Sequence, residues 1–403
     1  MPGIVVIGAG QAGASVVAKL RAEGFDGAIT LIGDEPVPPY QRPPLSKKYL
    51  LGDLALERLY LRPERFYSEA DIDLRLGQKV TGIDPAAKAV IIGQERLGYD
   101  DLVLATGSLP RRLPASIGGD LGGVHVVRTL ADVDSMAPGF LPGAKVLIVG
   151  GGYIGLEAAA VAASRGMQVV LVEMGERILQ RVAAKETSDY FRALHTRHGV
   201  DIREGIGLDR LLGAGQVSAA RLSDGCELAV DMVIVGVGIT PDTALAEAAG
   251  LAIDNGIAVD AVGRTSDPSI WAIGDCASFP YRGGRLRLES VPNAIDMGDC
   301  VAGNIIGKHI EYVPRPWFWS DQYDVKLQIA GLNTDYDRIV TRAAEGEDAV
   351  SFWYFKGAQL LAVDAMNDPR AYMVGKRLID AGKTADPDQV GDASVDLKAL
   401  LKA

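Results

Sequence analysis

Two short segments of the sequence carry the glycine spacing that is typical of a phosphate-binding turn. Residues 8–13 read GAGQAG and residues 150–155 read GGGYIG, each after an apolar, strand-like stretch and before a helical one. Glycines spaced G-x-G-x-x-G let the chain turn sharply and bring backbone N–H groups close to a pyrophosphate. The N-terminus of the following helix favours the negative charge of the phosphates. Both segments are therefore candidate pyrophosphate sites.

Each candidate turn is followed by a second strand that ends in an acidic residue. Asp34 follows the stretch AITLIG, and Glu173 ends the stretch QVVLVE. A carboxylate in this position accepts a hydrogen bond from a ribose 2′-hydroxyl and repels a 2′-phosphate. Glu173 therefore predicts NADH rather than NADPH, a preference that Arg177 close by would soften. Asp34 is the expected ribose ligand of the other nucleotide, with its neighbour Glu35 as the weaker candidate.

The unit of strand, turn, helix, strand and acid occurs twice at matched length. The helical stretches run between glycines at 13 to 24 and at 155 to 166, and later segments at 101–107 and 231–238 supply a further buried strand to each unit. A lone G-x-G-x-x-G is weak evidence, since such a turn can serve only to pack a helix on a strand. The duplication of the complete unit favours two Rossmann-like dinucleotide-binding domains and thus two nucleotides.

Composition narrows the remaining possibilities. A length of 403 residues suggests two to three domains, and the formal net charge of -11 argues against nucleic acid and anionic membranes as partners. No apolar run is long enough to span a membrane, and no basic or cleavable apolar segment precedes the first strand, so we expect a cytoplasmic protein. The cysteines and histidines show neither a redox pair nor metal-ligand spacing, so we expect no metal site.

The order of the elements predicts three domains. Residues 1–109 and 242–316 are expected to form one discontinuous dinucleotide-binding domain, and residues 110–241 the second. From residue 317 the pattern changes to short alternating runs followed by the helical stretch DPRAYMVGKRLIDAG. Such a pattern is typical of an antiparallel sheet with a helix against it, so residues 317–403 are expected to form a small α+β domain.

Several motifs together resemble one known family. The sequence is similar to FAD-dependent pyridine-nucleotide reductases, and most of all to the ferredoxin reductases that serve oxygenases. This resemblance implies a glutathione-reductase-like α/β fold and covers essentially the whole chain. The motifs that carry it are YQRPPLSK at 40–47, ATGSLPR at 105–111, GGGYIGLE at 150–157, WAIGDCA at 271–277, ESVPNA at 289–294 and WFWSDQY at 317–323.

The resemblance implies which residues hold FAD. The first glycine turn would bind the pyrophosphate, Lys47 would lie beside flavin N5, Asp275 would hold the ribityl chain, and Trp319 would lie near the edge of the ring. The alternatives that involve no cofactor are a solvated basic loop for Arg42 and Lys47, a helix cap for Asp275 and a core position for Trp319. The complete FAD set is Gly8, Gly10, Ala12, Gly13, Asp34, Arg42, Lys47, Val80, Ala105, Thr106, Arg128, Asp275, Val291 and Trp319.

The second turn would bind NADH, and a lysine and a glutamate are the candidates for catalysis. A cation beside flavin N5 stabilises the reduced flavin, and the resemblance gives this role to Lys47. A buried ammonium needs a partner, for which Glu157 is expected; otherwise Glu157 is merely an acid in the first turn of its helix. The NAD set is Gly150, Gly152, Tyr153, Ile154, Gly155, Glu173 and Gly238.

The expected electron acceptor is a small iron–sulfur protein. Disulfide reductases of this fold carry cysteines after the second strand, but residues 34–60 contain none. A thiol substrate is therefore not expected. The resemblance implies instead a 2Fe–2S ferredoxin that feeds an oxygenase, with a haem monooxygenase favoured over a ring-hydroxylating dioxygenase. We expect the reductase to be a monomer or weak dimer. The alternatives are a rubredoxin reductase, an NADH oxidase, a monodehydroascorbate-type reductase, or a redox-sensing protein like apoptosis-inducing factor. The expected docking residues are Arg285, Arg287, Arg315, Lys326 and Arg370.

Overall fold

The computed structural model describes residues 3–344 and 349–402, and the chain divides into two compact units. Unit 1 comprises Met1–Arg42, Ala55–Leu109 and Ile239–Arg315. Unit 2 comprises Pro43–Leu54, Pro110–Gly238 and Pro316–Ala403. The expected second dinucleotide-binding domain and C-terminal domain thus fall in one unit, together with the segment that contains Lys47. The bounds of the three domains expected from the sequence stay a prediction.

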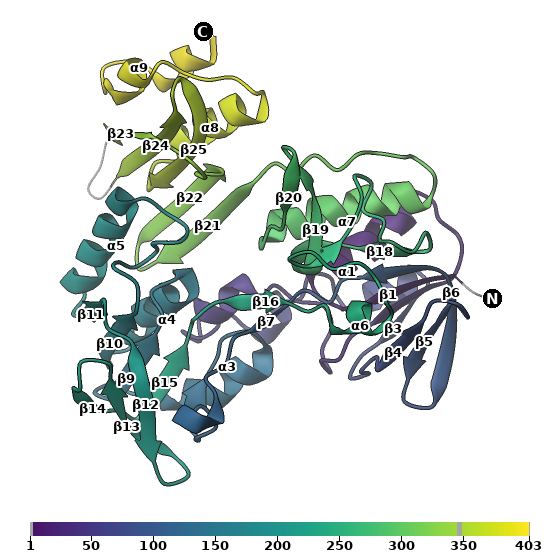
Figure 1. The fold of residues 1–403 in the computed structure, drawn as a ribbon, viewed down its shortest axis with the longest axis horizontal. Coiled ribbons are helices and arrows are strands. Elements are labelled where there is room, and N and C mark those ends of the chain that lie inside the picture. Colours follow the sequence, from purple (N-terminus) through teal and green to yellow (C-terminus); the bar gives the residue numbers. More distant parts are fainter. Residues whose placement is uncertain (1–2, 345–348, 403) are drawn as a thin grey trace. The chain divides into compact units, whose positions relative to one another are not determined.

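Unit 1 is built around a largely parallel sheet in the order β3-β2-β1-β6-β5-β4, with β18 beside β6. The helices α1 and α7 pack on one another, as Figure 1 shows in purple and green. The apolar faces of α1 and of the strands form one continuous core. The helices and strands are β1 Gly3–Ile7, α1 Gln11–Ala22, β2 Ile29–Ile32, α2 Arg65–Glu69, β3 Ile72–Arg75, β4 Gly82–Asp84, β5 Ala89–Ile92, β6 Glu95–Leu104, β7 Ser108–Pro110, β16 Ile239–Pro241, α6 Ala244–Ala248, β17 Ile257–Ala258, β18 Ile270–Ala272, β19 Ala277–Tyr281, β20 Gly284–Leu286 and α7 Val291–Ile305.

Unit 2 contains two five-stranded sheets and a small antiparallel one. The first five-stranded sheet, β11-β10-β9-β15-β8, is parallel and repeats the strand–helix–strand arrangement of unit 1. The helices and strands of this part are β8 Val124–His125, α3 Leu130–Met136, β9 Lys145–Val149, α4 Tyr153–Ser164, β10 Gln168–Glu173, α5 Lys185–Arg197, β11 Asp201–Glu204, β12 Leu208–Gly213, β13 Val217–Leu222, β14 Glu227–Ala229 and β15 Met232–Val235.

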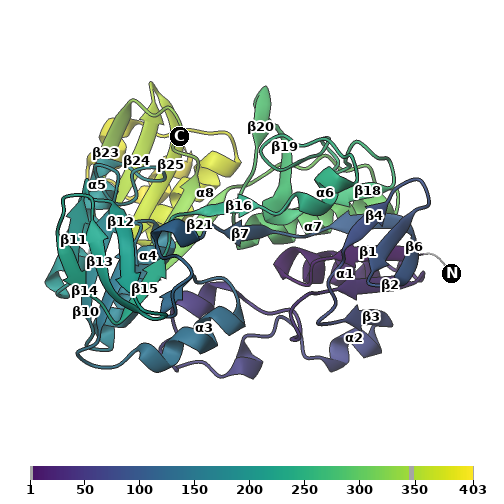
Figure 2. The ribbon, with the colours of Figure 1, turned by 60° about the horizontal axis from the view of Figure 1, so that its bottom comes forward.

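The second five-stranded sheet of unit 2 confirms the expected antiparallel C-terminal sheet. Its order is β21-β22-β25-β24-β23, and α8 packs against β22 and β25 (Figure 2). Asp368 caps α8 by accepting a hydrogen bond from the backbone N–H of Ala371. The elements are β21 Trp317–Gln322, β22 Val325–Gly331, β23 Arg338–Ala343, β24 Val350–Lys356, β25 Gln359–Met366, α8 Pro369–Asp380 and α9 Pro387–Gly391.

Within residues 3–344 and 349–402, none of the helices has both the length and the apolar character that a membrane span requires.

Candidate active site

The first glycine of each turn has a backbone conformation that other residues rarely adopt. Gly8 has φ 109° and Gly150 has φ 108°. A Cβ atom would lie 2.2 Å from the carbonyl oxygen of Ala105 at the first position and 2.5 Å from that of Gly236 at the second. Both turns therefore require glycine here, for the conformation and for the close approach of a neighbouring loop.

The third glycine of each turn lets a helix pack directly on the turn. A Cβ on Gly13 would lie 2.0 Å from the carbonyl oxygen of Gly8, and a Cβ on Gly155 would lie 2.1 Å from that of Gly150. The two helices, α1 and α4, each contain 12 residues. The two turns thus match one another in conformation, in packing and in the length of the helix that follows.

The middle glycines, Gly10 and Gly152, face open space. They are the N-caps of α1 and α4, and neither helix has a side-chain hydrogen bond at its cap. A Cβ on either glycine would meet no atom of the described chain within 4 Å. The first-turn N–H groups that such caps leave without an intrahelical partner suit a diphosphate. Both turns therefore fit the pyrophosphate of a dinucleotide, with Ala12 in the first turn of α1 and Tyr153 and Ile154 in that of α4.

In unit 1, Asp34, two residues after the end of β2, differs from its neighbour Glu35 in its contacts. The carboxylate of Glu35 accepts hydrogen bonds from the hydroxyl of Tyr40 at 2.7 Å and from Nη2 of Arg42 at 2.6 Å. The guanidinium of Arg42 also lies over the ring of Tyr40. Glu35 is thus engaged by side chains, so Asp34 stays the stronger candidate for contact with a ribose. Arg42 is part of an ion pair and not a solvated loop residue.

In unit 2, Glu173 is held by the backbone of the turn itself. Its two carboxylate oxygens accept hydrogen bonds from the N–H groups of Gly151 and Gly175, both at 2.7 Å. Arg177 does not face this carboxylate with a free guanidinium, because it donates to the carbonyl of Ala183 at 2.9 Å and to the hydroxyl of Ser188. The guanidinium of Arg177 is therefore engaged by neighbouring residues of the chain. The expectation that Arg177 softens the preference for NADH loses its support.

Two arginines that the sequence did not single out border the predicted NAD residue Gly238. A Cβ on Gly238 would lie 3.4 Å from Nη2 of Arg181 and 3.9 Å from Cδ of Arg111. Both arginines are exposed. Their position beside the turn residues would place positive charge near the phosphates of a nucleotide. Arg111 stands in the motif ATGSLPR, which is the one signal that could have found it.

Several of the other expected FAD residues of unit 1 lie close to the first turn. The Cβ of Ala12 lies 3.0 Å from where a Cβ on Gly274 would be, so α1 and the loop after β18 approach closely. The hydroxyl of Ser108 donates to Oδ2 of Asp275 at 2.9 Å, and that of Thr106 to the carbonyl of Asp242 at 2.6 Å. The remaining members in this unit are Val80 and Ala105, which are buried, and Val291, which begins α7. Lys47, Arg128 and Trp319 belong to unit 2.

Unit 2 contains the expected pair of Lys47 and Glu157. The ammonium Nζ of Lys47 lies 2.8 Å from Oε2 of Glu157, and the two side chains are 14% and 1% exposed. Ser46 donates to the same oxygen at 2.5 Å, and Ser320 to Oε1 at 2.6 Å. The reading of Glu157 as a first-turn acid is wrong, because the first turn of α4 contains no acidic residue. The sequence did not reveal the two serines.

The aromatic residues of β21 lie on two faces of the strand. Trp317 and Trp319 stack with ring centroids 5.4 Å apart, and Phe318 on the other face packs against Tyr153 at 4.9 Å. The hydroxyl of Tyr153 is buried and has no hydrogen-bond partner among the described residues, and its burial raises the pKa. The side chain of Tyr153 thus points into the protein, so its backbone is the part available to a nucleotide.

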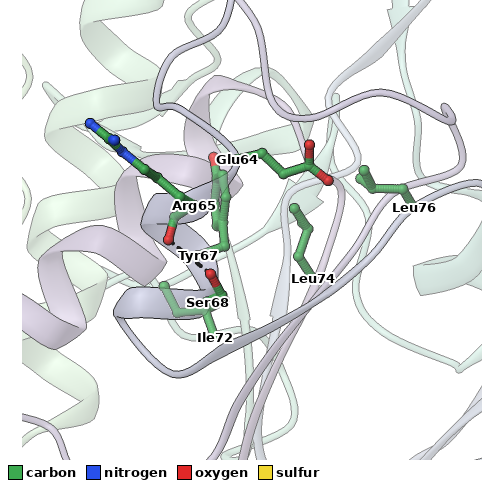
Figure 3. A pocket seen from close by; sticks show the side chains of 7 residues that line it. All are labelled: Glu64, Arg65, Tyr67, Ser68, Ile72, Leu74 and Leu76. Atoms are coloured by element: carbon green, nitrogen blue, oxygen red, sulfur yellow. Dashed lines mark hydrogen bonds between the residues drawn. The ribbon is translucent and has the colours of Figure 1, made fainter.

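A separate hollow of about 540 Å³ lies in unit 1 between α2 and β3 (Figure 3). Tyr67 lines it, and burial raises the pKa of this tyrosine to about 12. None of the residues predicted from the sequence contributes to this hollow, so it is not part of the candidate active site. Its lining residues are Glu64, Arg65, Tyr67, Ser68, Ile72, Leu74 and Leu76.

The two matched glycine turns give this chain two candidate dinucleotide sites. The family models agree: residues 2–298 match Pyridine nucleotide-disulphide oxidoreductase, and residues 317–401 match Reductase C-terminal. The chain belongs to the pyridine nucleotide-disulphide oxidoreductase family, and it is an FAD-dependent oxidoreductase. The family resemblance seen in the sequence is thereby confirmed.

Relatives with established names match along nearly the whole chain. The rhodocoxin reductase of Rhodococcus erythropolis is 41% identical over 99% of this chain and 94% of its own length. The putidaredoxin reductase CamA of Pseudomonas putida is 40% identical over 99% of this chain and 97% of its own length. One is thus named as a reductase of rhodocoxin and the other as a reductase of putidaredoxin.

Solved structures of similar proteins confirm the fold. The putidaredoxin reductase in its covalent complex with putidaredoxin matches with a TM-score of 0.96 and 40% identity, over 100% of this chain and 98% of that one. The ferredoxin reductase for the CYP199A2 system from Rhodopseudomonas palustris matches with a TM-score of 0.95 and 38% identity, over 99% of both chains. The predicted glutathione-reductase-like α/β architecture with a C-terminal α+β domain is confirmed.

Proposed function

We propose that this protein is an NADH-dependent ferredoxin reductase that passes electrons to a 2Fe–2S ferredoxin serving an oxygenase. A haem monooxygenase is the favoured terminal enzyme, because similar proteins are named for putidaredoxin and for the CYP199A2 system. The observation that carries the proposal is the full-length match to such reductases in a chain that retains two intact dinucleotide turns. The cytoplasm is the proposed location.

FAD is proposed to bind in unit 1 and NADH in unit 2. When bound, the flavin would supply the ability to accept a two-electron hydride and to release the electrons one at a time. The first turn and Asp34 hold the pyrophosphate and ribose of FAD. The second turn, through Gly152, and the carboxylate of Glu173 do the same for NADH, with Arg181 beside the phosphates.

Lys47 is proposed as the cation beside the flavin ring, with Glu157 as its counter-ion. A buried ammonium is costly in isolation, but the 2.8 Å contact with Glu157 compensates its charge. Because Glu157 also accepts hydrogen bonds from Ser46 and Ser320, the carboxylate is fixed on both oxygens. A fixed carboxylate in turn fixes Lys47, so the positive charge is in place before negative charge develops on the flavin.

A thiol acceptor is not supported. Cys276 and Cys300 are buried, and burial raises the pKa of both thiols. Cys226 immediately precedes β14, in the small antiparallel sheet β12-β13-β14, and is not among the residues of the candidate active site. A reactive thiol needs a lowered pKa and access to its substrate. The acceptor is therefore proposed to be an external one-electron carrier.

The docking surface is proposed to include α8. Only some of the basic residues expected from the sequence are proposed to belong to it. Arg287 pairs with Glu289 and has an 11% exposed side chain, and Arg285 donates to the carbonyl of Val259 at 2.8 Å. Both are engaged inside unit 1 and are poor docking residues, whereas Arg315, Lys326 and Arg370 are exposed. A hollow of about 410 Å³ on unit 2 combines basic and apolar side chains, which suits an acidic ferredoxin with an apolar centre. It is lined by Arg370, Met373, Val374, Arg377, Lys398 and Leu401.

The test is to reduce the holoenzyme with NADH in a stopped-flow instrument and mix it with candidate acceptors. Rapid reduction of a 2Fe–2S ferredoxin, with slow reaction toward oxygen, quinone and rubredoxin, is the expected result. Faster turnover with oxygen, quinone or rubredoxin would replace the proposal with the corresponding oxidase or reductase. A long-lived reduced complex whose oligomeric state changes would indicate a redox sensor instead.

A further inference from the structure

A buried chain of hydrogen bonds leads from the carboxylate of Glu157 to the ring of His195. Ser320 donates to Oε1 of Glu157 at 2.6 Å, and Nε2 of Gln322 donates to the hydroxyl oxygen of Ser320 at 3.2 Å. The amide oxygen of Gln322 lies 2.7 Å from Nε2 of His195. Ser320, Gln322 and His195 are completely buried, and they come from β21 and α5 of unit 2.

The carboxylate sets the direction of every hydrogen bond in this chain. A carboxylate only accepts, so the hydroxyl of Ser320 must donate to it, and the amide nitrogen of Gln322 can then donate to Ser320. Because the amide oxygen of Gln322 only accepts, Nε2 of His195 must carry a proton. Nδ1 of His195 is then left as an acceptor, 3.2 Å from the hydroxyl of Tyr323. All donors thus point toward Glu157.

The end of this hydrogen-bond chain that is farthest from Glu157 lies against the rings of Tyr323 and His198. Burial lowers the pKa of His195 to about 4, so at neutral pH this histidine is the uncharged tautomer that the chain requires. The ring of His198 stacks on that of Tyr323 with centroids 3.6 Å apart. The chain is therefore a set of neutral dipoles ending at the buried ion pair, and none of its members carries a competing charge.

We propose that Ser320, Gln322 and His195 are positioning residues for the reducing half-reaction. Their aligned donors hold the carboxylate of Glu157 in one orientation, and Glu157 in turn holds the ammonium of Lys47. Ser46 fixes the opposite oxygen from its own segment. In a buried network, each bond polarises the next, and removing one member leaves its neighbours without a partner. This proposal rests on the proposed function, because it assigns these residues to the approach of a hydride to the flavin.

The experiment measures flavin reduction by NADH in the holoenzyme of Ser320→Ala and Gln322→Met. Loss of a hydrogen bond to a charged group is expected to lower the limiting rate constant about tenfold, with the apparent Kd for NADH within about twofold of wild type. Asp321→Ala is the matched control, because Asp321 lies between the two residues on the other face of β21. It should reduce at the wild-type rate.

Two further variants separate positioning from a merely structural effect. Ser320→Thr keeps a hydroxyl and should restore the rate to within about threefold of wild type. In a Glu157→Gln background, Ser320→Ala should cause no further loss, because its effect passes through Glu157. FAD content and thermal midpoint identify any variant that fails to fold, and Gln322→Met then serves alone because it leaves Ser320 in place.

The outcomes distinguish this proposal from the proposed function. If Lys47→Met is slow but both Ser320→Ala and Gln322→Met reduce at the wild-type rate, the positioning proposal is overturned while the role of Lys47 stands. Equal losses in Ser320→Ala and Ser320→Thr, or full additivity with Glu157→Gln, would also overturn it. If the flavin of Lys47→Met is reduced at the wild-type rate, the role of Lys47 in the proposed function is contradicted.

Discussion

Lys47 and Glu157 form a buried ion pair with 2.8 Å between Nζ and Oε2. The two residues come from segments that are far apart in the sequence, one from the loop after Arg42 and one from the second turn of α4. Their pairing converts two isolated charges that would each be costly to bury into a compensated pair. The remaining carboxylate oxygen is satisfied by Ser320, so the pair has one defined geometry.

The open middle glycines predict two separable cofactor defects. Gly10→Ala should fold normally, because the new Cβ meets no described atom within 4 Å, but it should lose FAD. Gly152→Ala should keep FAD and weaken NADH binding about tenfold or more, since a Cβ would displace the phosphates from the N–H groups. FAD content and NADH titration by flavin reduction check both. Loss of NADH affinity in Gly10→Ala with full FAD content would contradict this assignment.

The bridging carboxylate of Glu173 predicts a strong preference for NADH. Glu173→Ala should lower the efficiency of flavin reduction by NADH about tenfold and narrow the difference between NADH and NADPH, because the ribose loses its acceptor and the 2′-phosphate its repulsion. Glu176→Ala is the matched control, since Glu176 is exposed on the same loop. Comparable efficiencies for the two nucleotides in the wild-type enzyme would show that Glu173 does not select between them.

The buried carboxyl of Asp364 predicts an unusual dependence of stability on pH. Burial raises the pKa of Asp364 to about 6, even though Tyr354 and Thr187 donate to its Oδ2. Because the folded state holds this proton more tightly than the unfolded state, the group's contribution to stability falls as pH rises from about 4 to about 6. Asp364→Asn should therefore raise the free energy of unfolding by up to about 3 kcal/mol at pH 8 and by little at pH 4.

Urea unfolding of wild type and Asp364→Asn at the two pH values checks this expectation. The amide keeps an oxygen that can accept from Tyr354 and Thr187, so the comparison isolates the ionisation of the carboxyl. An equal gain at both pH values, or a loss at pH 8, would show that the carboxylate is well accommodated when it is charged.

The basic hollow on α8 predicts that ferredoxin reduction depends on salt. Arg370→Glu with Arg377→Glu should slow ferredoxin reduction at low ionic strength and flatten its salt dependence, while flavin reduction by NADH stays unchanged. Lys356→Glu is the control, because Lys356 is an exposed charge on β24, in the sheet against which α8 packs. Wild-type ferredoxin kinetics in the double variant would rule out this face as the docking surface.

The sequence predicted the parts of the site that depend on local spacing. The glycine turns, Asp34 after β2, Glu173 at the end of β10 and the antiparallel C-terminal sheet all follow from patterns within a short segment. The chain of Ser320, Gln322 and His195 could not be predicted, because it depends on β21 packing against helices that are far away in the sequence. The alternation in WFWSDQ does place Ser320 and Gln322 on one face, but it does not show that this face is buried.

The positive charge of a residue was not enough to predict its role. Arg287 looked like a docking residue because it is basic, yet it is paired with Glu289 and largely buried. Arg177 was expected to soften the preference for NADH because it lies close to Glu173, yet it donates to the carbonyl of Ala183. In both cases the partner that occupies the guanidinium comes from the fold of a loop, which spacing does not reveal.

The most direct test of the account is the rate of flavin reduction by NADH in Lys47→Met, measured beside Lys48→Met. The two lysines are neighbours, but Lys48 is exposed whereas Lys47 is paired with Glu157. With FAD fully bound in both, Lys47→Met should reduce at least about tenfold more slowly than wild type, and Lys48→Met should match wild type. Wild-type reduction kinetics in Lys47→Met would contradict the claim that this ion pair belongs to the hydride-transfer site.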